Sequence, residues 1–298
     1  MIAGTSTGGI LAATLTVPDA RGRPKYTAEQ VRAAYFLHGG EIFRRGPLRA
    51  IKTLGGLTGP KYSPRALDRL LEEYLGKERL HATLTEILVT AYDMSSSTPW
   101  FFKTSFARGH RSPADDPLLT QVVRATTAAP TYFPPLTMGE HCLIDGGVFA
   151  CNPALCAYAQ ARNMYPNEKE FLVVSLGTGQ EEHDRPCSQV ESWGILGWAV
   201  PISGVMLNSS SATVNYQMRA LVGAVNYARF QVQLGKGASD MDDASPENIK
   251  RLELIAQQAV RQNSAEIDRL CRLLTARTPA IAATVSHRFD KAGGRATW

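Results

Sequence analysis

Several features that mark other protein classes are missing from this 298-residue sequence. No uninterrupted apolar run reaches the ~18 residues that cross a bilayer, so no transmembrane helix is expected. The five cysteines form no C-x-x-C pair and their number is odd, which favours free thiols in a reducing compartment. The first residues show no signal-peptide pattern, and we therefore expect a cytoplasmic protein.

Patterns of charge and of metal ligands are also sparse. The 32 basic and 27 acidic side chains give a net charge of +5, without a dense basic run interleaved with aromatic residues, so nucleic-acid binding is not expected. The positive charge suits anionic lipid headgroups, and it suits an ordinary solvated surface equally well. His81, His110 and His141 lack the spacing of a metalloprotease helix, so we expect no metal site and no cofactor.

The most informative stretch is the first ten residues, in which Gly4-Thr5-Ser6-Thr7-Gly8 fits the G-x-S-x-G nucleophile elbow. In an elbow, a strand turns sharply into a helix and exposes a serine at the tip, and the flanking glycines stand where a Cβ would not fit. Residues 10–15 are apolar and suit the helix that follows, whose N-terminus would favour negative charge developing at Ser6. Taken alone, the motif is more often an ordinary Gly-rich turn.

Later stretches favour the catalytic interpretation. After GTSTGG at 4–9, the sequence carries, in order, ATTAAPTYFPP at 125–135, DGG at 145–147, LVVSLGTG at 172–179 and MDDASPEN at 241–248. With these five motifs, the sequence resembles the patatin-like phospholipases over most of its length. The resemblance implies lipid acyl hydrolysis by a Ser-Asp dyad, with Ser6 as the nucleophile and Asp145 as its partner. Membrane phospholipid or another acyl lipid would be the substrate, and the oligomeric state does not follow from the sequence.

Such a dyad needs an aspartate that accepts the serine proton. An aspartate in water, with a pKa of about 3.9, is a weak base, so Asp145 would have to be partly desolvated and within hydrogen-bond reach of Ser6. The two residues lie 139 positions apart (145 − 6), so only the fold can join them. Gly146 and Gly147 are expected to turn the chain away from the acyl group, and the Thr7 backbone N–H is expected to serve as an oxyanion donor.

One departure from the family pattern leaves other functions open. The family normally carries a D-G-G-G-x-R-G oxyanion loop before the elbow, where this sequence starts, and the look-alike at 290–295 is taken as coincidence. We therefore interpret the domain at 1–277 as N-terminally incomplete, and expect this form to be poorly soluble or weakly active. The first alternative is a lipid-binding or regulatory module without hydrolysis. The second is a Ser-His-Asp α/β-hydrolase that uses His183 or His287, although that fold builds most of its sheet before the elbow.

The hydrophobic pattern predicts an α/β fold, a three-layer sandwich with a mostly parallel central sheet. The strand at 141–145 is expected beside the elbow strand, with Asp145 at its C-terminal end, the edge where open α/β sheets bind ligands. An irregular loop is predicted at 44–62 and a tail at 278–298. The other predicted elements are buried strands at 86–92 and 170–176, strands at 99–104 and 230–234, and helices at 27–38 (ended by Gly39-Gly40), 63–75, 118–128, 153–163 and 245–270.

Residues 193–223 form an unusually apolar stretch that carries Trp193 and Trp198 and is interrupted by glycines and a proline. Tryptophan favours the membrane interface. One interpretation is therefore a lid or lipid-contacting face, with peripheral membrane contact through 193–207. The other interpretation is a helix packed onto the core.

Overall fold

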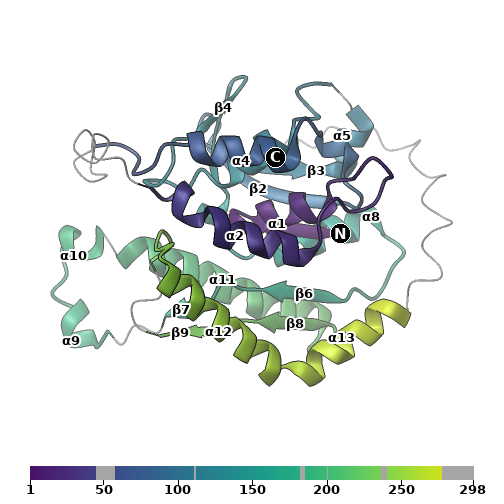
Figure 1. Cartoon of the computed structure of the whole chain (residues 1–298). Helices are drawn as coiled ribbons and strands as arrows, with labels where there is room; N and C mark the ends of the chain where they lie inside the picture. The colour runs from purple at the N-terminus through teal and green to yellow at the C-terminus, as the bar shows by residue number, and fades with distance from the viewer. Residues whose placement is uncertain (45–57, 111, 182–184, 200, 236–239, 277–298) are drawn as a thin grey trace. The chain divides into compact units, whose positions relative to one another are not determined.

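The computed structural model describes residues 1–44, 58–110, 112–181, 185–199, 201–235 and 240–276 (Figure 1). His183, His287, the look-alike at 290–295 and the tail at 278–298 lie outside these residues, as does most of the predicted loop at 44–62. The chain divides into two compact units, Met1–Asn248 and Ile249–Trp298, and each is described by itself. The predicted domain boundary at 277 stays a prediction.

One sheet of the first unit carries the Ser6 turn. Its strands are β1 (Ile2–Thr5), β2 (Ile87–Asp93), β3 (Thr98–Lys103), β4 (Leu136–Met138) and β5 (His141–Asp145). β1 runs parallel to β2, whereas the pairs β2–β3, β2–β5 and β4–β5 are antiparallel. Two small parallel pairs join β6 (Val173–Leu176) to β8 (Tyr227–Phe230) and β7 (Gln180–Glu181) to β9 (Gln233–Leu234). The predicted α/β class is confirmed, with parallel and antiparallel pairs in the sheets.

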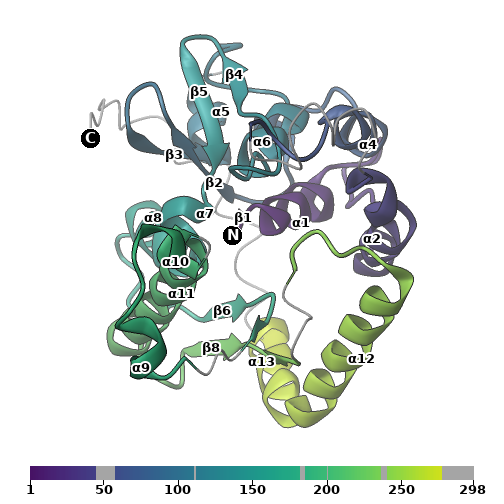
Figure 2. The ribbon, with the colours of Figure 1, turned by 90° about the vertical axis from the view of Figure 1, so that its left-hand side faces the viewer.

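The register of β2 brings the ends of β1 and β5 together. β3 pairs along one edge of β2 over residues 88–93, so β1, which pairs with 87–90, and β5, which pairs with 91–93, must share the other edge. β1 ends with Thr5 opposite Thr90, and β5, running the other way, ends with Asp145 opposite Ala91. The two strands therefore meet end to end beside β2 (Figure 2). The expectation that β5 would lie alongside the elbow strand is wrong. β5 runs antiparallel to β2 and pairs with residues 91–93, beyond the residues that pair with β1.

Helices cover both faces of this sheet. Alternate residues of β2, namely Ile87, Val89 and Ala91, join the main core with residues of α1 (Thr7–Thr16), α4 (Arg65–Leu75) and α6 (Leu119–Thr126). On the opposite face, the ring of Tyr92 packs against Phe149 of α7 (Gly147–Ala150), with 6.4 Å between ring centroids. The predicted order of helix, sheet and helix layers is confirmed.

Three predicted details differ from the structure, and in α2 the cause is tertiary packing that overrides the local pattern. α2 (Ala28–Ile42) starts at the predicted Thr27 capping box but runs through Gly39-Gly40, since Ile42 packs against the main core and Glu41 pairs with Arg69. β6 is not buried on both faces, because it belongs to a two-stranded sheet, and Leu176 is 75% exposed. The predicted strand at 230–234 is divided between the end of β8 and β9.

The remaining helices of the first unit are η2 (Leu80–Ala82), α5 (Thr104–His110), α8 (Ala154–Met164), α9 (Cys187–Val190), α10 (Ile195–Ala199) and α11 (Pro201–Val222).

Two helices lead into and form the described part of the second unit. α12 (Pro246–Gln262) starts in the first unit, and α13 (Ser264–Ala276) follows it after Asn263. The single long helix predicted from 245 is therefore wrong. Asn263 donates from both its backbone N–H and its side-chain Nδ2 to the Ala259 carbonyl, a side chain–backbone hydrogen bond of the kind that favours a helix end. Within the described ranges of the chain, no helix is long and apolar enough to cross a bilayer.

Candidate active site

Ser6 occupies the sharp turn between β1 and α1. Its backbone has φ 54° and ψ −120°, and a positive φ is uncommon and strained in a residue other than glycine. The Ser6 carbonyl accepts hydrogen bonds from the backbone N–H groups of Gly9 at 2.8 Å and Ile10 at 3.2 Å, which start α1 directly after the turn. The structure thus places Ser6 at the tip of a strand–turn–helix unit, with Thr7 exposed as the first residue of the helix.

The glycines around Ser6 differ in whether the structure leaves room for a side chain. A Cβ on Gly4 would lie 2.0 Å from the Gly8 carbonyl oxygen, so the tight turn excludes any side chain there. A Cβ on Gly8 would meet no atom within 4 Å, so the steric reason expected for this glycine is wrong. The second crowded position is Gly9, where a Cβ would lie 2.6 Å from the methyl group of Thr126.

Asp145 ends β5 with its side chain almost completely buried, as the residue is 5% exposed. Burial raises the pKa of Asp145 to about 6, although hydrogen bonding to the Ser6 side chain and to the Gly147 N–H lowers it. The Gly147 N–H donates to Oδ1 at 2.7 Å. A carboxyl with this pKa is a stronger base than an exposed aspartate and is still largely ionised at neutral pH.

The two glycines after Asp145 let the chain pass close to other groups. A Cβ on Gly146 would lie 2.2 Å from Oγ1 of Thr90, and a Cβ on Gly147 would lie 3.1 Å from Oδ1 of Asp145. At Gly146 the crowding therefore comes from β2. Gly147 also lies beside α11, because its Cβ would be 3.8 Å from a methyl carbon of Leu207.

Sequence reasoning missed the groups that hold these two residues. The Ser6 N–H donates to Oγ1 of Thr126 at 2.8 Å, and the Asp145 N–H donates to the Ala128 carbonyl at 3.1 Å. The ATTAAP stretch therefore contacts both residues, although the sequence marked it only as a family motif. A pair of buried or half-buried hydroxyls, Thr5 and Thr90, forms a further link at 2.7 Å.

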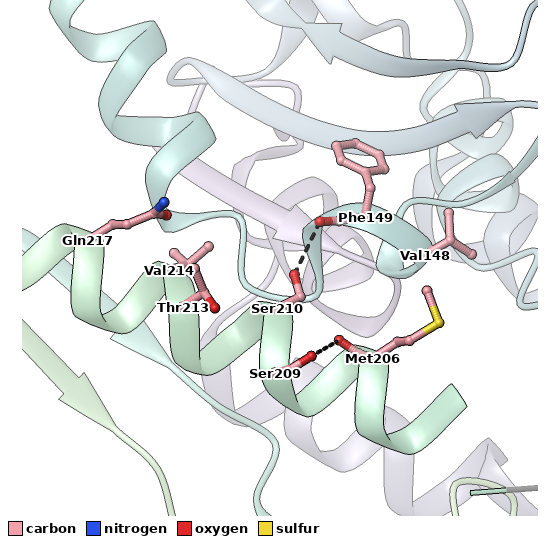
Figure 3. A pocket seen from close by; sticks show the side chains of 8 residues that line it. All are labelled: Val148, Phe149, Met206, Ser209, Ser210, Thr213, Val214 and Gln217. Atoms are coloured by element: carbon pink, nitrogen blue, oxygen red, sulfur yellow. Dashed lines mark hydrogen bonds between the residues drawn. The ribbon is translucent and has the colours of Figure 1, made fainter. Parts of the chain in front are cut away.

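A hollow of about 400 Å³ opens beside α7, the short helix that follows Asp145. Figure 3 shows that side chains from α7 and α11 line it, and that the Ser210 hydroxyl donates to the Phe149 carbonyl, at 3.2 Å, to tie the two helices together. The hollow is open to solvent over much of its extent and is not an enclosed cavity. The lining is half apolar and half polar: Val148, Phe149, Met206, Val214, Ser209, Ser210, Thr213 and Gln217.

Two of the histidines that the structure describes form ion pairs with aspartates other than Asp145. His81 pairs with Asp116, at 2.6 Å, and His141 pairs with Asp93, at 2.8 Å. Burial raises the pKa of Asp93, but hydrogen bonds from His141 and from neighbouring groups outweigh it and lower that pKa to about 2. In the part of the chain that the structure describes, no group of His, Cys, Asp and Glu side chains could hold a metal ion, and the five cysteines are free.

Comparisons with known proteins agree with the motifs. A family model described as "Patatin-like phospholipase" matches residues 1–158. Patatin-like protein 2 of Arabidopsis thaliana is 33% identical over 90% of this chain and 74% of its own length. Patatin-like protein 2 of Oryza sativa subsp. japonica is 32% identical over 90% of the chain and 75% of its own length. Patatin-11 of Solanum tuberosum is 31% identical over 96% of the chain and 82% of its own length.

Proposed function

Because the chain belongs to the patatin-like phospholipase family, we propose that it is a lipid acyl hydrolase of the phospholipase A or lysophospholipase type, with Ser6 and Asp145 as its dyad. The observation that carries the proposal is the buried carboxyl of Asp145, which has a pKa of about 6 and interacts with the Ser6 side chain. Perturbed carboxyls of this kind concentrate at catalytic sites. The family names phospholipid or another acyl lipid as the substrate class.

The proposed reaction proceeds through an acyl-enzyme. Asp145 takes the hydroxyl proton of Ser6 while Oγ attacks the ester carbonyl carbon, and the resulting tetrahedral intermediate expels the lysolipid or alcohol, which receives the proton from Asp145. Asp145 then takes a proton from water, whose oxygen attacks the acyl-serine. The fatty acid leaves, and the proton returns to Oγ of Ser6.

The start of α1 supplies stabilisation for the negative oxygen of the tetrahedral intermediate. Thr7 is the first residue of the helix, and the first N–H groups of a helix have no partner within it and point toward its N-terminus. No acidic side chain stands in the first turn of α1 to oppose an anion. We assign the Thr7 N–H as an oxyanion donor on this basis.

The apolar surface at 193–207 is the proposed contact with the lipid phase. Ile195 and Leu196 of α10 are 89% and 91% exposed, and Trp193 and Trp198 pack edge to face beside them. α11 continues this surface toward the site, since Leu207 lies beside Gly147. The hollow between α7 and α11 is the proposed position of the acyl chain.

The dyad is tested with variants and an active-site probe. Ser6→Ala and Asp145→Asn should each abolish fatty-acid release from phosphatidylcholine vesicles while the circular dichroism spectrum stays that of the wild type. A fluorophosphonate should label Ser6 alone in the wild type. Retained hydrolysis by Ser6→Ala would overturn the proposal, and equal losses in His183→Ala or His287→Ala would favour the Ser-His-Asp alternative.

The lipid contact is tested by removing exposed apolar side chains. Replacement of Ile195 and Leu196 by serine should weaken co-sedimentation with phosphatidylcholine vesicles and leave hydrolysis of a soluble nitrophenyl ester unchanged. The matched control replaces Leu37 of α2 and Val225 of the turn between α11 and β8, which are 74% and 73% exposed, by serine. Equal vesicle binding by both double variants would exclude 193–207 as the contact surface.

A further inference from the structure

We propose that Thr126 is a positioning residue that holds the Ser6 turn in its strained conformation. The inference rests on the proposed role of Ser6. It assigns to a single hydroxyl in the ATTAAP stretch a function that the motif alone does not reveal.

Both branches of the Thr126 side chain contact the turn. Oγ1 accepts the Ser6 N–H at 2.8 Å, and the methyl group lies against Gly9, where a Cβ would be only 2.6 Å away. Thr126 is completely buried at the end of α6, so water does not replace the hydrogen bond. Because the Ser6 N–H points to Thr126, it is unavailable to the substrate oxyanion, and the first free N–H of this turn is that of Thr7.

Thr5, the residue before Ser6, is held by contacts of its hydroxyl with two other elements. The Thr5 hydroxyl donates to the Ala150 carbonyl of α7 at 2.7 Å, so its oxygen must accept the proton of Thr90 in the 2.7 Å contact between their Oγ1 atoms. The turn is thus held by α6 on Ser6 and by α7 and β2 on Thr5. With Thr5 anchored, loss of the Thr126 acceptor frees the Ser6 backbone in particular.

The link to Asp145 explains why this matters for the reaction. Thr126 lies two residues before Ala128, whose carbonyl accepts the Asp145 N–H at 3.1 Å. One short segment therefore fixes the backbones of both Ser6 and Asp145. A shift of Ser6 against Asp145 by about 1 Å is enough to lower a rate by about 10²-fold.

The test removes the acceptor and keeps the shape. Thr126→Val should lower kcat on a soluble ester, and the rate of fluorophosphonate labelling of Ser6, by about 10- to 100-fold, with KM unchanged. Thr126→Ser keeps the hydroxyl and should stay within a few-fold of the wild type. The matched control is Thr127→Val, because Thr127 is also buried but donates its hydroxyl back to the Val123 carbonyl.

Each outcome separates the inference from the proposed function. Equal kcat for Thr126→Val and Thr127→Val, at equal folded fraction, would overturn the inference, and so would a change in KM alone. A loss of kcat in Thr126→Ser as large as in Thr126→Val would also overturn the inference. If Thr126→Val does not fold, Thr126→Cys, whose sulfur is a weak acceptor, takes its place with the same expected loss. A wild type that is not labelled at Ser6 would instead contradict the proposed function.

Discussion

At the scale of single residues, the burial of Asp145 predicts the pH dependence of the proposed reaction. Burial raises the pKa of its carboxyl to about 6, and only the ionised form accepts the Ser6 proton. We expect kcat/KM on a soluble ester to rise as pH increases through about 6 and to level off above it. Initial rates in overlapping buffers measure this profile. A flat profile between pH 5 and 8 (about one pH unit or more on each side of the pKa) would contradict a base at Asp145.

The same burial also carries a stability penalty. The native pKa of Asp145 lies above its unfolded value, so the native state is favoured while the carboxyl is protonated, and this advantage is lost as pH rises from about 4 through 6. A difference of one between the native and unfolded pKa values corresponds to about 1.4 kcal/mol. Asp145→Asn should therefore raise the free energy of unfolding at pH 8 by about 3 kcal/mol, while abolishing activity. Urea unfolding of the variant and the wild type at pH 8 and pH 4 measures this change in the free energy of unfolding. The gain should be far smaller at the lower pH.

At the scale of elements, Gly4 and Gly8 form a matched pair for testing the turn between β1 and α1. Gly4→Ala should strongly destabilise the protein, because its Cβ would strike the backbone carbonyl of Gly8 at 2.0 Å. Gly8→Ala meets open space in the first turn of the helix, and alanine is favoured over glycine there by up to about 1 kcal/mol. Thermal unfolding should therefore show a large loss for the first variant and none for the second. Similar losses in both would contradict this description of the turn.

Much of this architecture follows from local sequence pattern, and the part that does not follow depends on distant pairing. The Thr27 capping box, the buried run of β2 and the end of β5 at Asp145 are readable because each depends on residues close in sequence. The end-to-end meeting of β1 and β5 is not readable, since no local signal states which edge of β2 a distant strand joins. The hydrogen bond to the Thr126 hydroxyl could not be predicted for the same reason, because Ser6 is 120 residues away.

At the scale of the whole molecule, the net charge of +5 predicts an electrostatic contribution to the proposed lipid binding. Basic side chains near an anionic bilayer contribute about 1 kcal/mol each, and salt screens this attraction. We expect stronger co-sedimentation with vesicles that contain phosphatidylserine than with phosphatidylcholine vesicles, and a decline of this difference as sodium chloride is raised. Equal binding to both vesicle types at low salt would show that charge contributes nothing.

For the proposed dyad, the meeting of β1 and β5 beside β2 has a consequence during synthesis of the chain. Ser6 leaves the ribosome 139 residues before Asp145 (145 − 6), an interval of roughly 7 to 30 s at about 5–20 residues per second. Throughout that interval, the chain carries the proposed nucleophile without its proposed base. If Ser6 and Asp145 act as proposed, hydrolysis begins only after β5 has been made and has paired with β2, so the order of the chain would delay activity until most of this sheet exists.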